Sequence, residues 1–166
     1  ANLKERLAKI KDERKKQAVE RIANQINELN ARRMNHFSNV LDKLAEALGR
    51  ISSRADKAAS RGLDVGSIRI AISVAQVAID TARETLRVQL GKIYTVSVNT
   101  EDKLKADVGV ARELLHSDLK KVEDVVKAVR DAVRNVAVSL AKIKGVDDGR
   151  PAATSTPPIS TSTSAQ

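Results

Sequence analysis

Residues 34–67 read MNHFSNVLDKLAEALGRISSRADKAASRGLDVGS, and this stretch decides the fold. Its apolar side chains recur at alternating gaps of three and four, which places them on one stripe of an α-helix. The stripe comprises Met34, Phe37, Leu41, Leu44, Leu48, Ile51, Ala55 and Ala58. Gly62 then offers the left-handed position that ends a helix, and Asp64 can cap the next one. The stretch therefore predicts a helical hairpin.

The three-four spacing continues on both sides of this hairpin. It predicts helices over about residues 3–60, 65–92 and 101–144, with residues 18–145 forming an elongated, antiparallel three-helix bundle. The fold class is therefore all-α. The second stripe carries Ile68, Ile72, Ala75, Ile79, Ala82, Leu86, Leu90 and Ile93. Ile70, Val74, Val77 and Ala78 widen the apolar surface, so we expect this helix to contact both neighbours.

The first and third helices carry comparable stripes. The first begins with Val19, Ile22, Ile26 and Leu29, and the third includes Leu104, Val108, Ala111, Leu115 and Val122. Gly145 is the natural stop of the third helix.

Residues 93–100 alternate β-branched apolar and polar side chains, which is typical of extended backbone. We expect a connector that lays Tyr94, Val96 and Val98 along a groove, followed by Asn99 or Thr100 as a helix cap. The second helix is about 42 Å long and the connector adds about 26 Å, which matches helices of about 63 and 66 Å. A tight loop instead would stagger the long helices and favour head-to-tail association into a ring or filament.

Residues 1–17 form a basic segment in which seven polar residues, 11–17, follow one another. We expect a solvated helical extension. Residues 1–33 hold ten basic and five acidic residues, and so five of the nine net positive charges. The candidate polyanion-binding residues are Lys4, Arg6, Lys9, Lys11, Arg14, Lys15, Lys16 and Arg21. The alternative, which we prefer, is a solvated helix whose charges pair internally, for example Asp12 with Lys15 and Lys16.

The composition argues against an enzyme. The 166 residues include no cysteine, no tryptophan and only two aromatic residues, Phe37 and Tyr94. His36 and His116 have polar neighbours, and we expect them to be surface or groove-lining residues. The paired carboxylates Glu101-Asp102, Glu123-Asp124 and Asp147-Asp148 are all expected at the surface, where their pKa values have no reason to rise. We therefore expect no catalytic residues, no cofactor and no metal.

Residues 146–166 are rich in Ser, Thr and Pro, and they contain too little apolar surface to fold alone. We expect a disordered tail, of the kind that is typical of extracellular linkers and stalks. The chain begins at Ala1, which fits removal of a signal peptide, although a cytoplasmic tail is the alternative. No apolar run approaches the length of a membrane span.

The arginine-rich segment RISSRADK, residues 50–57, is followed by RGLDV, residues 61–65. Together they resemble the arginine-rich helix and Gly-Val-Asp turn of small exported helical proteins that are abundant in ultra-small, reduced-genome bacteria. The resemblance extends over about residues 19–140, with the spacing of long helices. It implies export and a helical bundle, and it transfers no activity and no site residues.

Two functions follow as hypotheses. The first is a non-enzymatic, exported structural or interaction protein: a helical rod that self-assembles at the cell surface as a filament or surface component, with Tyr94, Val96 and Val98 as candidate self-association residues. The second is a polyanion- or DNA-binding protein of the nucleoid-associated type, which uses the basic N-terminal segment without specific nucleic-acid readout. The expected partners are therefore a second copy of the chain or an anionic polymer.

Overall fold

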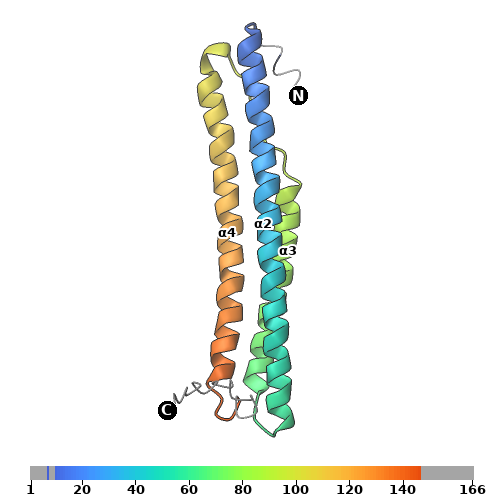
Figure 1. Ribbon diagram of the computed structural model, residues 1–166. Helices are drawn as coiled ribbons and strands as arrows, with labels where there is room; N and C mark the ends of the chain where they lie inside the picture. The colour runs from blue at the N-terminus through green and yellow to red at the C-terminus, as the bar shows by residue number, and fades with distance from the viewer. Residues whose placement is uncertain (1–6, 8–9, 147–166) are drawn as a thin grey trace, which may run out of the picture.

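The computed structural model describes residue 7 and residues 10–146, and these residues fold into a long rod of three helices (Figure 1). The helices are α2 (Glu13–Ser60), α3 (Gly66–Leu90) and α4 (Leu104–Ala141), with a short 3-10 helix, η1 (Glu101–Lys103), before α4. All three helices pack against one another, α2 and α4 run in the same direction, and α3 runs in the opposite direction. The predicted all-α three-helix bundle is confirmed, and no strand occurs among the residues that the structure describes.

The hairpin between α2 and α3 has the predicted geometry. Gly62 adopts a φ of 82°. Its N–H donates to the carbonyl of Ala59 at 2.9 Å, and the N–H of Leu63 donates to that of Ala58 at 3.1 Å. This pair of bonds is a Schellman motif, which satisfies two carbonyls at the end of α2. The Asp64 carboxylate accepts from the N–H of Gly66 at 2.9 Å and so serves the start of α3.

Two apolar clusters form the core along the rod. The main core lies where all three helices are present, from Met34 on α2 to Leu140 on α4. The connector core lies beyond the end of α3, where residues 92–100, the connector, take the place of that helix and include the predicted extended residues 93–100. Tyr94, Val96 and Val98 are buried there, while the intervening Thr95 and Ser97 are exposed. The predicted connector is therefore confirmed.

The long helices are flush at both ends of the rod. At one end, the Lys15 ammonium lies 2.7 Å from the Glu101 carboxylate. At the other end, the Arg61 guanidinium donates to the carbonyl of Val146 at 2.7 Å. The staggered alternative is wrong because the connector runs extended along the rod and makes up the length that α3 lacks (Figure 1).

The N-terminal segment differs from the predicted continuous helix. The first long helix begins at Glu13, because Asp12 caps it by accepting from the N–H groups of Arg14 and Lys15. Leu7 and Ile10 are buried in the connector core. This packing corrects the prediction of a wholly solvated extension. Residues 1–6 and 8–9, and the predicted tail from residue 147 onward, lie outside the described residues.

The apolar width of α3 also differs from prediction. Ile70, Val74 and Val77 are 69%, 61% and 63% exposed, so they contact neither neighbouring helix in the expected way. Only Ala78 packs partly against the main core. The third helix ends at Ala141, and turns lead to Gly145, whose φ of 84° confirms that it could not continue the helix.

We expect Gly62→Ala to destabilise the protein by about 1–2 kcal/mol, because a side chain is strained in the left-handed conformation. Gly49→Ala is the matched control. Gly49 lies inside α2, and a Cβ there would meet nothing within 4 Å, so this substitution should stabilise by about 0.5–1 kcal/mol. Urea unfolding of both variants checks the pair. Equal effects of the two substitutions would contradict the assigned role of Gly62.

Candidate functional site

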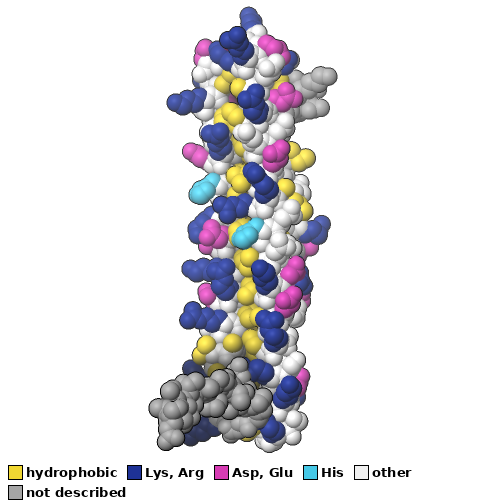
Figure 2. Space-filling model, in the orientation of Figure 1, with side chains coloured by type: hydrophobic (Ala, Val, Ile, Leu, Met, Phe, Trp, Pro, Cys, Tyr) yellow, Lys and Arg dark blue, Asp and Glu magenta, His cyan; other side chains and the backbone are white. Residues whose placement is uncertain are grey.

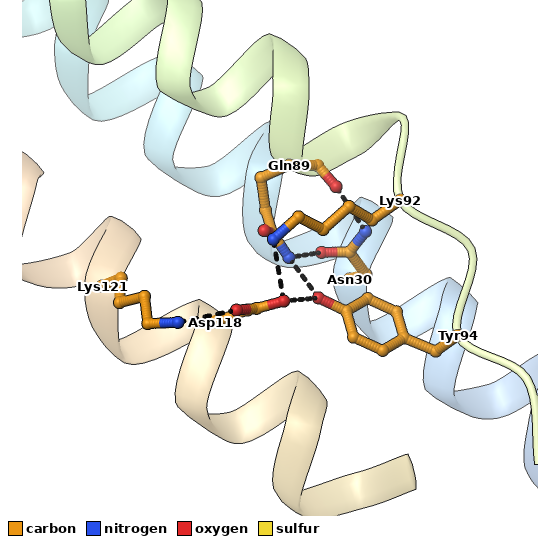
Figure 3. Close-up of polar contacts among 6 residues, drawn as sticks. All are labelled: Asn30, Gln89, Lys92, Tyr94, Asp118 and Lys121. Atoms are coloured by element: carbon orange, nitrogen blue, oxygen red, sulfur yellow. Dashed lines mark hydrogen bonds and ion pairs between the residues drawn. The ribbon is translucent and has the colours of Figure 1, made fainter.

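A buried polar cluster lies where α3 ends and the connector begins (Figure 3). Its four buried members are Asn30 on α2, Gln89 on α3, Tyr94 on the connector and Asp118 on α4. Periodicity placed Leu29, Leu90 and Ile93 on the apolar stripes instead, but these residues are 39%, 49% and 80% exposed. The sequence analysis therefore missed three polar residues at stripe positions.

Hydrogen bonds join the four residues into one chain. The Asn30 amide donates to the backbone carbonyl of Gln89 at 3.0 Å. In return, the Gln89 side-chain amide donates to the Asn30 oxygen at 3.0 Å and to the Tyr94 hydroxyl at 2.6 Å. The Tyr94 hydroxyl donates to Oδ2 of Asp118 at 2.9 Å. All three helices and the connector are thereby linked at one level of the rod.

Two lysines neutralise Asp118 from the surface. The ammonium of Lys92 lies 2.8 Å from Oδ2, and that of Lys121 lies 3.2 Å from Oδ1. The hydrogen bond from Lys92 is the largest cause that holds the pKa of Asp118 below its usual range, and the bonds from Tyr94 and Lys121 add to it. Burial raises the pKa of Tyr94 to about 12. At neutral pH the site therefore pairs an ionised Asp118 with a neutral phenol.

A second group of contacts fixes the other end of the connector. The Asp107 carboxylate accepts from the backbone N–H and the side-chain amide of Asn99 at 2.9 and 2.7 Å. Thr100 occupies the N-cap position before η1, as predicted, but its side chain makes no cap bond. Near Tyr94, the Asn27 side chain donates to its carbonyl and accepts from its N–H, at 2.9 and 2.8 Å.

These contacts use the hydrogen-bonding capacity of the buried polar groups within the fold. Both Asp118 oxygens already accept hydrogen bonds, and every buried side-chain nitrogen and oxygen in the described part of the chain has a partner. A shallow groove of about 600 Å³ between α3 and α4 reaches the cluster past Lys92 and Lys121. Among residue 7 and residues 10–146, no group of His, Asp and Glu could hold a metal ion.

The predicted polyanion-binding residues differ in their surroundings. Lys4, Arg6 and Lys9 lie outside the described residues. Lys15 pairs with Glu101, and Lys16 lies 3.5 Å from Glu13. The backbone N–H of Lys11 also donates to Glu101, at 3.2 Å, whereas the side chains of Arg14 and Arg21 are exposed. Lys15 and Lys16 are thus paired with acidic residues, but with Glu101 and Glu13 and not with Asp12 as the alternative expected.

The predicted self-association residues are already covered. Tyr94, Val96 and Val98 are at most 4% exposed and pack in the connector core of their own chain. In this fold they offer no surface to a second copy, so the expectation for these three residues needs correction.

A basic groove lies between α2 and α4, in the middle of the rod. Its volume is about 410 Å³, and its polar lining residues are Arg33, His36, His116, Lys120, Glu123, Lys127 and Arg130. Figure 2 shows Lys and Arg side chains on both sides of the apolar seam on this face, with the two histidines beside it. Both histidines are exposed, as expected for groove-lining residues.

The chain was compared with protein-family models, with curated proteins and with solved structures, and none of the three comparisons gave a match. No helix in the described part of the chain is long and apolar enough to cross a membrane.

We expect Tyr94→Phe to destabilise the fold by about 1–3 kcal/mol, because the buried Gln89 amide and the Asp118 carboxylate each lose a hydrogen-bond partner. Ile93→Ala is the control, since this adjacent residue is 80% exposed and should change stability by less than about 0.5 kcal/mol. Urea unfolding measures both variants. A neutral Tyr94→Phe would show that the cluster does not hold the connector.

The ionised Asp118 predicts a dependence of stability on acid. Because its folded pKa is lowered, its stabilisation is complete well above the unfolded pKa of about 3.9 and is lost as pH falls through the folded value. Asp118→Asn should lower the melting temperature at neutral pH and flatten its fall between about pH 5 and 2. Asp131→Asn, an exposed control on α4, should retain the wild-type profile.

Proposed function

We propose that this chain is a non-enzymatic, exported structural or interaction protein, a helical rod that associates side by side with further copies of itself through α3. The observation that carries the proposal is the apolar stripe of α3, defined by Ile70, Val74, Val77 and Val88, which are 52–69% exposed. Ile70, Val74 and Val77 are spaced by four and three residues, and Val88 follows three turns later, which is the spacing of a helix seam without a partner.

The charge of the molecule favours a second copy at this stripe. With a net charge of +9, two copies repel each other over most of their surface. Residues 66–79 of α3 contain one charged residue, Arg69. Contact there brings apolar surface together without burying opposed cations. Thr81 continues the stripe, and its hydroxyl already donates to the carbonyl of Val77 at 2.9 Å.

An antiparallel pairing of two α3 helices gives complementary flanks. If the twofold axis passes between Val74 and Val77, heptad geometry places Val74 of one copy against Val77 of the other. Ser73 then faces Asp80, and Ala71 faces Ala78, so no like charges meet at these flanking positions. The stripe thus fits an isologous dimer interface.

Export is supported by the resemblance to small exported helical proteins and by the Ser, Thr and Pro content of residues 146–166. The non-enzymatic assignment is supported by the buried cluster, in which Asp118 is fully occupied by Tyr94, Lys92 and Lys121. Both parts of the proposal are consistent with a structural role, in which the protein acts through its shape.

Sedimentation of the full chain at concentrations up to about 0.1 mM tests self-association. The wild type should form dimers or larger species, and Val74→Glu with Val77→Glu should weaken association at least about tenfold, because four carboxylates would meet in the seam. Val110→Glu with Leu114→Glu is the matched control, since these α4 residues are 66% and 56% exposed.

The two possible failures are distinguishable. A wild-type protein that stays monomeric throughout would refute self-association. Loss of association in the α4 control, with none in the α3 variant, would place the interface on another helix.

A further inference from the structure

The basic groove contains cations that the fold leaves without partners. Arg33 on α2 and Lys127 and Arg130 on α4 line it, and they form no ion pair with any residue that the structure describes. Lys120 lies 3.1 Å from Asp124, and the groove contains one acid of its own, Glu123. Four cations against one groove-lining carboxylate leave the groove with an excess of positive charge.

Two acidic residues of α2 pair with arginines of α3. Asp42 pairs with Arg83 at 2.9 Å, and Asp56 pairs with Arg69 at 3.2 Å, both on α3. The α2 positions that follow His36 at intervals of seven are, by contrast, all basic: Lys43, Arg50 and Lys57. On α4, Lys120, Lys127 and Arg134 repeat at the same interval. Each interval of seven is about 10 Å, so two rows of cations run along the seam.

Three ring side chains lie in the same groove. His36 and Phe37 come from α2 and His116 comes from α4, and the rings of His36 and Phe37 lie 5.7 Å apart. His36 and Phe37 are adjacent in the sequence, whereas His116 lies about 80 residues further along the chain. The structure brings them together between the two rows of cations.

We propose that the basic groove binds single-stranded nucleic acid through the phosphates of the nucleic-acid backbone, without reading the base sequence. Rows of cations suit a linear chain of phosphates better than one small anion, which would need donors converging on a point. Arg33 and Arg130 can each hold a phosphate with two N–H groups. The imidazoles and Phe37 offer flat faces to bases, and such stacking tolerates any base.

This binding site goes beyond the proposed structural role and does not rest on it, because the groove lies on the α2 and α4 face and the apolar stripe lies on α3. A monomeric rod and an associated rod would both present it. The groove also replaces the N-terminal basic segment as the expected place of polyanion contact.

Fluorescence anisotropy with a labelled oligothymidylate at about 50 and 200 mM salt tests the proposal on the full chain. Lys127→Gln with Arg130→Gln should weaken binding at least about tenfold at low salt, and should reduce the salt slope by about 1.4, or 0.7 for each lost phosphate contact. Arg33→Gln, an independent variant on the other wall, should reduce the slope by about half as much.

The control is Arg69→Gln with Arg87→Gln, which removes the same charge from exposed positions on α3 and should change binding less than about twofold. His36→Ala with His116→Ala should weaken binding at about pH 8 without changing the salt slope, because stacking is not screened by salt. Circular dichroism confirms that each variant keeps its helices.

Three results would overturn the proposal. The first is equal weakening by the groove and α3 variants, which would leave only net charge. The second is loss of binding in Arg14→Gln with Arg21→Gln while the groove variants bind normally. The third is binding of inorganic polyphosphate as tight as that of the oligothymidylate, together with unchanged oligothymidylate binding by the histidine variant. This result would indicate a general polyanion site.

Discussion

The hydrogen bond from the Tyr94 hydroxyl to Asp118 is the contact on which the architecture depends. It is buried, it crosses from the connector to α4, and it continues through Gln89 to Asn30, so one chain of bonds touches every helix. An unpaired carboxylate at this depth would be costly, and the two lysines that reach it from the surface remove that cost. The same bonds set the place where α3 stops and extended backbone begins. These bonds therefore fix how the three helices, which differ in length, align with one another along the rod.

Charge is sorted by the same packing. Ion pairs between α2 and α3 use Asp42 and Asp56 of α2, whereas Arg33 of α2 lines the groove on the side that meets α4. Each pair is exposed and contributes little to stability. Their effect is on the distribution of charge, since the groove between α2 and α4 keeps an excess of cations whereas residues 66–79 of α3 contain one charged residue. The proposed nucleic-acid site lies in the first region, and the proposed self-association surface lies in the second.

Much of the fold could be predicted from the sequence, and the failures have one cause. Three-four spacing gave the helices, and Gly62 and Gly145 gave the turns, because local sterics decide these features. The same method prefers an apolar residue at every stripe position, so it selected Leu29 and Leu90 beside the buried Asn30 and Gln89. The seven-residue step from Leu115 to Val122 was the available signal, since the stripe position between them is Asp118. Polar residues take these positions because the connector carries a hydroxyl and backbone groups that apolar neighbours could not satisfy. The groove was also beyond prediction, because its rings come from helices about 80 residues apart in sequence and meet only through the register of packing.

Replacement of the last part of α3 by extended backbone makes the rod mechanically uneven. The section around the main core contains three helices. The section around the connector core contains two helices, the connector, and the buried residues Leu7 and Ile10. Local opening at the connector core breaks fewer cooperative contacts than opening at the main core, so the two sections differ in the free energy of local unfolding. Backbone amide exchange and protease cleavage should accordingly begin at the connector, while the section around the main core stays folded.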